Sequence, residues 1–173
     1  MARLETLETE RLTLRPQRPE DAVTFRTLWK ERDHRVPPHR RIDAGGRPTV
    51  EDVAASIRAE SQSARLRLLT VVRTQGGEVL GYCGLNGHGS GTPEEPELAY
   101  ELLCDCHGQG YATEAARAVV AWADEAGYRR LRAGVWDWNV ASLRVLDKLG
   151  FRVTGQVERR SEHGASLLTV RER

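Results

Sequence analysis

Hydrophobic positions recur along the chain with two different periods, and these periods predict its elements. Residues 11–15 alternate between polar and apolar side chains, as a half-buried strand does. In residues 18–29 the apolar side chains instead fall on one face at helical spacing, and Pro19 suits the first helical turn. That face consists of Ala22, Phe25, Leu28 and Trp29. The pattern therefore begins with a strand followed by a helix.

The next segments predict a loop, a helix and a hairpin. Residues 34–48 contain three prolines and two glycines without periodicity, which indicates a loop. Thr49 and Asp52 have the spacing of a capping box, so we expect a second helix that runs through about residue 64. Residues 66–73 and 79–86 are apolar runs on either side of a glycine turn, which predicts a β-hairpin.

The remaining pattern predicts strands and helices in alternation. These segments are a glycine-rich loop at 87–96, a strand at 97–103, a helix at 110–126 that Gly127 ends, a strand at 130–136, a short helix that begins at Asn139 and closes at Gly150, and strands at 151–157 and 166–172. The order predicts a mixed α/β (α+β) fold, with a mostly antiparallel first half and a strand–helix–strand crossover in the second.

Composition narrows the class of protein. A chain of 173 residues with 39% hydrophobic and 29% charged side chains is typical of one soluble domain, residues 1–173. The net charge of +1 gives no reason to expect nucleic-acid or membrane binding through charge alone. Because the first residues, MARLETLETERLTLR, are too charged for a signal peptide, we expect a cytoplasmic protein.

A glycine turn precedes the predicted helix at 110–126. In HGQGYA, residues 107–112, Gly108 and Gly110 allow a ligand to approach the backbone, and the N–H groups that begin a helix favour anions such as phosphates. A diphosphate would fit there. The alternative is a simple strand-to-helix turn, and two glycines alone do not decide between them. The spacing matches neither a P-loop nor the three-glycine dinucleotide motif.

Three segments in order resemble the GNAT superfamily of acyl-CoA N-acyltransferases, and within it the RimJ/RimL-like branch of ribosomal-protein N-terminal acetyltransferases. They are ETERLTLRP followed by RPEDA, then ELAYELL with HGQGYATEAARAVVAWA, and finally NVASLRVLDKLGF. His107 stands where the family more often has Gln or Arg. The resemblance implies a mostly antiparallel sheet of about seven strands, splayed between the fourth and fifth, with about four helices.

The same resemblance implies a coenzyme A site. Backbone N–H groups of residues 108–113 would hold the diphosphate, and Leu102 would pair with the pantetheine arm in the gap between the splayed strands. The cofactor-binding residues so implied are Leu102, Leu103, His107, Gly108, Gln109, Gly110, Tyr111, Ala112, Thr113, Asn139 and Ser142. For Asn139 and Ser142 the alternative is helix capping, which suits both residue types, and for Tyr111 it is packing.

Transfer of acetyl to an amine requires a base, a donor for the carbonyl oxygen and an acid for the thiolate. Glu97 and Glu101 lie four apart on one predicted strand and so share a face. The resemblance favours Glu97 as base, then Glu101, with a solvated carboxylate as the alternative for each. The amide near Leu102 would polarise the carbonyl. Ser142 would protonate the thiolate, since the fourth helix lacks the tyrosine that many relatives use.

Other polar residues carry weaker hypotheses. We interpret Glu94 and Glu95, in a proline-flanked loop, as solvated. His34 and His39 lie in the loop that lines the acceptor site in the family, with solvated loop residues as the alternative. An odd number of cysteines without an export signal predicts reduced thiols. These are Cys83, Cys104 and Cys106. Cys104, Cys106 and His107 lack the further ligands of a zinc site, so we expect no metal.

The expected reaction is transfer of acetyl from acetyl-CoA to a primary amine, in a monomer or homodimer that needs neither nucleic acid nor membrane. The rival hypothesis is an acyl-CoA-binding domain without catalysis. The retained Glu97, Glu101, Asn139 and Ser142 favour an enzyme. The acceptor stays open, because members of this branch acetylate protein N-termini, free amino acids, polyamines or drugs on one scaffold.

Overall fold

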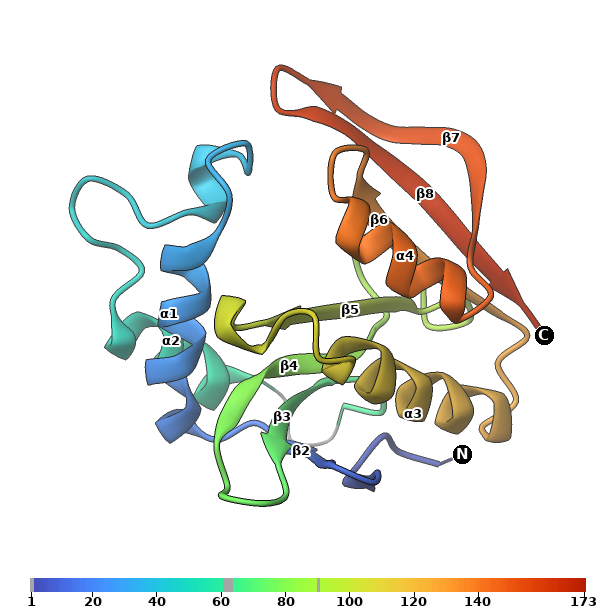
Figure 1. Cartoon of the computed structure of the whole chain (residues 1–173), viewed down its shortest axis with the longest axis horizontal. Coiled ribbons are helices and arrows are strands. Elements are labelled where there is room, and N and C mark those ends of the chain that lie inside the picture. Colours follow the sequence, from blue (N-terminus) through green and yellow to red (C-terminus); the bar gives the residue numbers. More distant parts are fainter. Residues whose placement is uncertain (1, 61–63, 90) are drawn as a thin grey trace.

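One eight-stranded sheet carries helices on both faces in the computed structural model, which describes residues 2–60, 64–89 and 91–173 (Figure 1). The strands, in the order in which they lie in the sheet, are β1 (Leu7–Glu8), β2 (Leu12–Pro16), β3 (Leu68–Arg73), β4 (Val79–Asn86), β5 (Glu97–Leu102), β6 (Arg130–Trp136), β8 (Gly164–Glu172) and β7 (Arg152–Ser161). The helices are α1 (Ala22–Glu31), α2 (Val50–Ala59), α3 (Tyr111–Glu125) and α4 (Val140–Lys148). Neighbouring strands are antiparallel except β5 and β6, which confirms the predicted mixed sheet.

Alternation along the strands divides the core into two layers. Leu98 and Leu102 of β5 lie in the larger apolar cluster with the buried face of α3. Tyr82 of β4 faces the other way, toward a smaller cluster built by α1 and α2. Glu97 and Glu101 alternate with the leucines and so share one face of β5, as predicted, and this face is the one on which Glu101 meets Arg32 at the end of α1.

Most predicted elements are confirmed, but α2 is shorter than expected. Its capping box is present, since the Thr49 hydroxyl accepts from the Asp52 amide at 3.1 Å and the Asp52 carboxylate accepts from the Thr49 amide at 2.8 Å. The helix nevertheless ends at Ala59 instead of about residue 64, because Glu60 has an extended backbone (ψ 132°). Of the segment expected to continue the helix, residues 61–63 lie outside the described residues.

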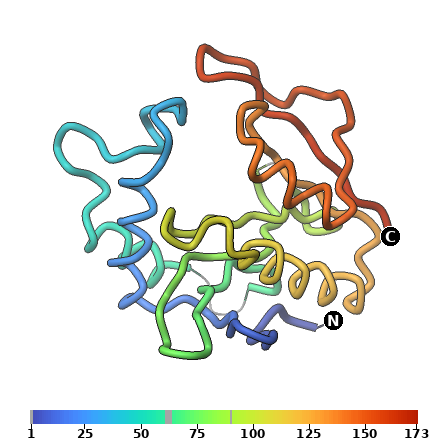
Figure 2. The backbone as a smooth tube through the Cα atoms, viewed as in Figure 1, coloured from blue at the N-terminus to red at the C-terminus, as the bar shows by residue number. Residues whose placement is uncertain are grey.

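The last hairpin is longer than the pattern predicts. β7 runs to Ser161 rather than 157, and β8 begins at Gly164 rather than 166. Every residue of β7 is exposed, so its sequence carries no alternation from which its length can be read. In Figure 2 the tip of this hairpin and the segment after α1 both stand at the top of the view.

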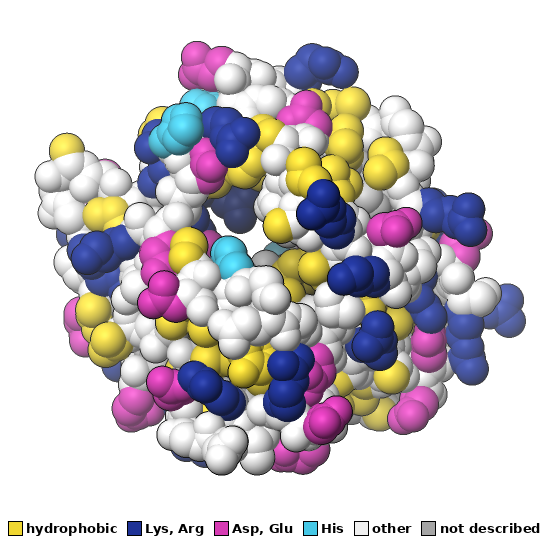
Figure 3. Space-filling view, in the orientation of Figure 1, with side chains coloured by type: hydrophobic (Ala, Val, Ile, Leu, Met, Phe, Trp, Pro, Cys, Tyr) yellow, Lys and Arg dark blue, Asp and Glu magenta, His cyan; other side chains and the backbone are white. Residues whose placement is uncertain are grey.

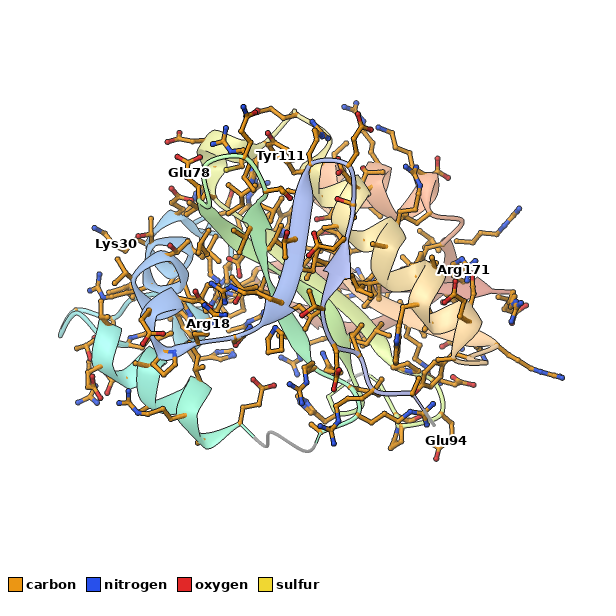
Figure 4. The ribbon with its side chains drawn as sticks, turned by 90° about the horizontal axis from the view of Figure 1, so that it is seen from below. Arg18, Lys30, Glu78, Glu94, Tyr111 and Arg171 are labelled. Atoms are coloured by element: carbon orange, nitrogen blue, oxygen red, sulfur yellow. The ribbon has the colours of Figure 1, made fainter. Side chains whose placement is uncertain are left out.

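Two buried or half-buried ion pairs attach distant elements to the sheet. Arg171 of β8 makes two bonds of 2.8 Å to Asp124 near the end of α3, and Figure 4 shows Arg171 on that side of the molecule. Asp21, which precedes α1, is 4% exposed. Its carboxylate accepts two bonds of 2.8 Å from Arg15 and one of 2.6 Å from the buried Thr70 hydroxyl. Asp21 therefore joins the start of α1 to β2 and β3.

Hydrogen bonding sets the charge state of Asp21. Burial alone would raise the pKa of this carboxyl, but bonds from Arg15, Thr70 and the Arg18 amide outweigh burial and lower the pKa below 3.8. Because the folded-state pKa is the lower one, the carboxylate stabilises the fold above the unfolded-state pKa. That stabilisation is lost as the pH falls through the folded-state pKa.

We expect Asp21→Asn to reduce the free energy of unfolding by roughly 2–3 kcal/mol at pH 7, since charge-assisted bonds in a buried site are lost. Urea titration measures the loss, and the difference from wild type should shrink below about pH 4. The control is Glu20→Gln, on the same turn but exposed, which should change stability by less than about 0.5 kcal/mol. Equal losses in both variants would contradict the role given to Asp21.

Candidate functional site

β5 and β6 pair only where β5 begins. Within the described residues their register contains the single pair Glu97–Arg132, and the Arg132 amide donates to the Pro96 carbonyl at 3.0 Å. Beyond this point β5 continues along β4 while β6 continues along β8. The predicted splay between these two strands is therefore confirmed.

A cleft of about 830 Å³ occupies the space between the separated strands. Such a volume is in the range of small-molecule sites. Figure 3 shows a hollow in the middle of the face that it draws. Residues of β5, β6, α4 and the β7–β8 hairpin line the cleft, together with Val36 and Arg40 from the segment after α1. The lining includes Glu97, Glu101, Asn139 and Ser142, so the cleft brings together four residues that the sequence singled out.

The β5 edge presents backbone groups to this gap. The Leu103 amide donates to the Leu80 carbonyl of β4 at 2.9 Å, so alternate residues from Leu103 backward face β4. Tyr100 and Leu102 therefore direct their N–H and C=O groups toward the gap, whereas Leu98 lies at the bridge to β6. The Leu102 carbonyl accepts a bond of 2.8 Å from Nε2 of His107, which leaves the Leu102 N–H directed at the gap. The Leu103 amide, in contrast, is used by the sheet.

The glycine turn adopts the backbone that an anion site needs. Gly108 and Gly110 have φ of 72° and 82°, a region that favours glycine, and α3 begins directly afterwards at Tyr111. The first N–H groups of α3 have no partner within the helix and lie at its positive end. The turn thus combines an exposed backbone with a helix N-terminus, as the sequence predicts.

Arg11, which sequence reasoning missed, holds this turn in place. Its guanidinium donates to the Gln109 carbonyl at 3.0 Å, pairs with Glu114 at 2.6 Å and lies 4.4 Å from the centre of the Tyr111 ring. Tyr111 itself is buried, in agreement with its packing interpretation, and Figure 4 shows it at the start of α3. Burial would raise the pKa of Glu114, but bonds from Thr9 and Arg11 outweigh it and lower that pKa. A charged Glu114 therefore anchors Arg11.

Comparison with known proteins identifies the family. The family model described as an acetyltransferase (GNAT) domain matches residues 11–152. The chain belongs to the GNAT acetyltransferase family. It is also 28% identical, over 157 residues, to the uncharacterized N-acetyltransferase p20 of Bacillus licheniformis, a match that covers 88% of this chain and 85% of that protein.

Solved structures share the GNAT fold over nearly the whole chain. An acetyltransferase from Agrobacterium tumefaciens is 26% identical with a TM-score of 0.73, and the match covers 100% of this chain and 97% of that one. Ribosomal-protein-S5-alanine acetyltransferase from Vibrio fischeri is 18% identical, with a TM-score of 0.63 and 96% of each chain covered. The acetyltransferase MccE, solved with acetyl-CoA and AMP, is 14% identical, with a TM-score of 0.73 and 95% and 94% covered. The last two likenesses concern the fold alone.

The two candidate bases of this GNAT acetyltransferase lie in different surroundings. Glu101 accepts two bonds of 2.8 Å from Arg32, at the end of α1, and one of 2.9 Å from the Tyr82 hydroxyl. Burial would lower the pKa of Arg32, but its bonds to Glu101 outweigh burial and raise that pKa. Glu101 is therefore fixed as the partner of a permanent cation. Glu97 stands at the closed end of the gap, where its carboxylate lies beside Gly134 of β6.

Two contacts define the start of α4. One is the capping bond that was the alternative interpretation of Asn139, and the other comes from Tyr100 of β5, which the sequence did not indicate. The Asn139 side chain accepts from the Ser142 amide at 3.1 Å, so Asn139 caps α4 and retains its amide N–H groups. The Tyr100 hydroxyl of β5 donates to the Ser142 carbonyl at 3.2 Å, which places a phenol beside the predicted acid. Burial raises the pKa of Tyr100, so the phenol keeps its proton. The sequence placed Tyr100 on a strand, but no local signal indicated that α4 would cover it.

The structure also bears on the loop residues Glu94, Glu95, His34 and His39, for which the sequence supported weaker hypotheses. Glu95 is partly exposed but ion-paired, which corrects the expectation of a simply solvated carboxylate: Arg132 binds it at 2.6 Å, a pairing that lowers the pKa of Glu95. This pair ties the loop before β5 to β6. Glu94 is exposed, as expected. His34 and His39 are exposed, and the cleft lining includes neither of them.

The three cysteines are free thiols: Cys83 and Cys106 are buried, and Cys104 is exposed. Among the described residues no group of three or more His, Cys, Asp and Glu side chains is arranged to hold a metal ion. The same residues include no helix long and apolar enough to cross a membrane.

Thiol labelling should distinguish these cysteines. Cys83 should react only after unfolding, because it is buried and burial raises its pKa. Cys104 should react first in the folded protein, and Cys106 more slowly. Ellman's reagent measures the time course, and Cys104→Ser should remove the fastest phase. A fast phase that survives this substitution would contradict the assignment.

Proposed function

We propose that this GNAT acetyltransferase, as a single domain of residues 1–173, transfers acetyl from acetyl-CoA to a primary amine by direct attack in a ternary complex. The acceptor is a protein N-terminus or a small-molecule amine. The observation that carries the proposal is the gap between β5 and β6: its closed end holds Glu97 in the cleft, its open β5 edge ends at Leu102, and the glycine turn before α3 follows in the chain.

Two parts of the chain suit acetyl-CoA, one its diphosphate and the other its pantetheine arm. Backbone N–H groups of residues 108–113 suit the diphosphate, because the turn leaves them at the positive end of α3. The gap-facing groups of Leu102 and Tyr100 suit the amide-bearing pantetheine arm, which would lie along β5 like an added strand. MccE, which shares the fold, is solved with acetyl-CoA. This cosubstrate would supply the activated acetyl group.

Each catalytic step has a candidate residue in the cleft or on the β5 edge beside it. Glu97 accepts the proton of the acceptor ammonium, directly or through water, so that the neutral amine attacks the carbonyl carbon. The Leu102 N–H donates to the carbonyl oxygen as its negative charge develops. When the carbon–sulfur bond breaks, the Ser142 hydroxyl gives its proton to the departing thiolate and regains one from the attacking nitrogen, which loses its second proton as the amide forms. Tyr100, whose phenol lies at the Ser142 carbonyl, is the second candidate for this acid.

The turn is tested by Gly110→Glu. A carboxylate at this position repels the diphosphate, so the affinity for coenzyme A, measured by isothermal titration, should fall roughly tenfold or more. Gly127→Glu is a matched control, because Gly127 also has positive φ (90°) but lies at the opposite end of α3. It should suffer the same backbone strain without loss of affinity. Equal affinities in the two folded variants would contradict the diphosphate site.

The base is tested by Glu97→Gln, which keeps the shape of the side chain but removes its basicity. We expect kcat to fall by about a hundred- to ten-thousandfold, with coenzyme A affinity nearly unchanged and partial recovery at higher pH. Glu101→Gln should cost much less in kcat and more in stability, because Arg32 loses its partner.

Thiol release and the unfolding curve of each variant provide these measurements. The reverse ranking of the two kcat values would transfer the role of base to Glu101. Two mild effects would mean that solvent deprotonates the amine. Coenzyme A binding without thiol release over a broad amine panel would instead favour a domain that binds acyl-CoA without catalysis.

A further inference from the structure

A β-bulge in β7 turns a third acidic side chain into the cleft, besides those of Glu97 and Glu101. Val157 pairs with Leu167 of β8, and Arg159 pairs with the preceding residue, Ser166. Glu158 is therefore the extra residue on β7 opposite a single step of β8. Bulges change the direction of side chains, and here Glu158 and Arg159, although adjacent on a strand, both line the cleft.

Glu158 and Glu97 meet over Gly134 of β6. A Cβ atom at residue 134 would lie 2.9 Å from a carboxylate oxygen of Glu158 and 3.4 Å from one of Glu97. The missing side chain of Gly134 thus leaves the space that these two carboxylates share. Among the described residues Glu158 has neither an ion-pair nor a hydrogen-bond partner, although its carboxylate is directed at this shared space.

Two carboxylates that face one space repel each other unless a cation lies between them. The rest of this part of the cleft also suits a cation. Trp136 and Trp138 line it as a stacked pair, with ring centres 6.1 Å apart, and indole faces attract cations. The guanidinium of Arg35 already lies 4.2 Å from the Trp138 ring. Because Arg32, Arg40 and Arg159 also line the cleft, the preference for an organic cation depends on the local pair of carboxylates and not on the overall charge of the lining.

We propose that Glu158 is a specificity-determining residue that binds a second cationic group of the acceptor. The inference rests on the proposed function, in which Glu97 removes the proton of the attacking ammonium. That step leaves the neutral amine without a charge for Glu158 to bind. The charge of Glu158 is then matched by an ammonium or guanidinium group elsewhere in the acceptor. The acceptor class is accordingly an amine that carries a further positive charge within a few bonds.

A matched series of four-carbon amines tests this charge preference. The series is 1,4-diaminobutane, n-butylamine and 4-aminobutanoate, in which the group remote from one amine is positive, uncharged or negative. We expect kcat/KM to decrease in that order for the wild-type chain. Glu158→Gln should reduce the preference for the diamine over n-butylamine by about three- to tenfold, through KM rather than kcat, as expected for a partly exposed charge pair.

Two further variants control the experiment. Glu162→Gln removes the same charge from the same hairpin, but Glu162 is 87% exposed and does not line the cleft, so the preference should persist. Gly134→Ala places a Cβ atom against both carboxylates and should displace the flexible end of Glu158, which reduces the preference without removing a charge. Coenzyme A affinity should stay unchanged in all three variants.

Arg159 could instead favour an acceptor with a negative charge, because it lies beside Glu158 and also lines the cleft. A wild-type preference for 4-aminobutanoate that Arg159→Gln removes would overturn the inference, as would equal diamine preferences in Glu158→Gln and Glu162→Gln. Failure of the proposed function is distinct, because it would appear as no thiol release with any amine. In that case, isothermal titration of 1,4-diaminobutane with coenzyme A present decides: Glu158→Gln must weaken binding and Glu162→Gln must not.

Discussion

β5 lies between two strands but is hydrogen-bonded along its length to one of them, and the site depends on this asymmetry. After the pair Glu97–Arg132, β6 continues along β8, so the gap-facing N–H and C=O groups of β5 lose their sheet partner. Unpaired backbone groups in a cleft are costly unless something binds them. His107 binds one of them, the Leu102 carbonyl, and an amide-bearing ligand can bind others. The parting of the strands therefore creates both the space and the polar edge.

Interactions on either side of the gap keep it open at one end and closed at the other. At the closed end, Glu95 pairs with Arg132 and so ties the loop before β5 to β6. On one face of β5, Glu101 binds Arg32, while on the opposite face the Tyr100 hydroxyl reaches the start of α4. Each of these contacts joins β5 or its preceding loop to a different element. Together they fix the position of a strand that has lost one neighbour.

The sequence predicted those parts of the site that depend on local pattern. Gly108 and Gly110 could be recognised because a turn with positive φ precedes an amphipathic helix. Glu97 and Glu101 could be placed on one face because strand alternation is regular there. The ion pair of Glu101 with Arg32 could not be predicted, because 69 residues separate the partners. Glu158 was missed because a bulge changes its direction and β7, exposed throughout, shows no alternation.

The contrast between Glu97 and Glu101 illustrates how a strand can assign different roles to identical side chains. Both residues face the same side, so alternation alone cannot distinguish them. The two residues differ in their position along the gap. Glu101 lies where α1 reaches β5 and receives three hydrogen bonds, two of them from a guanidinium. The guanidinium and the phenol therefore already occupy both carboxylate oxygens of Glu101. Glu97 lies where β6 is still close, and one of its carboxylate oxygens lies beside Gly134, which has no side chain.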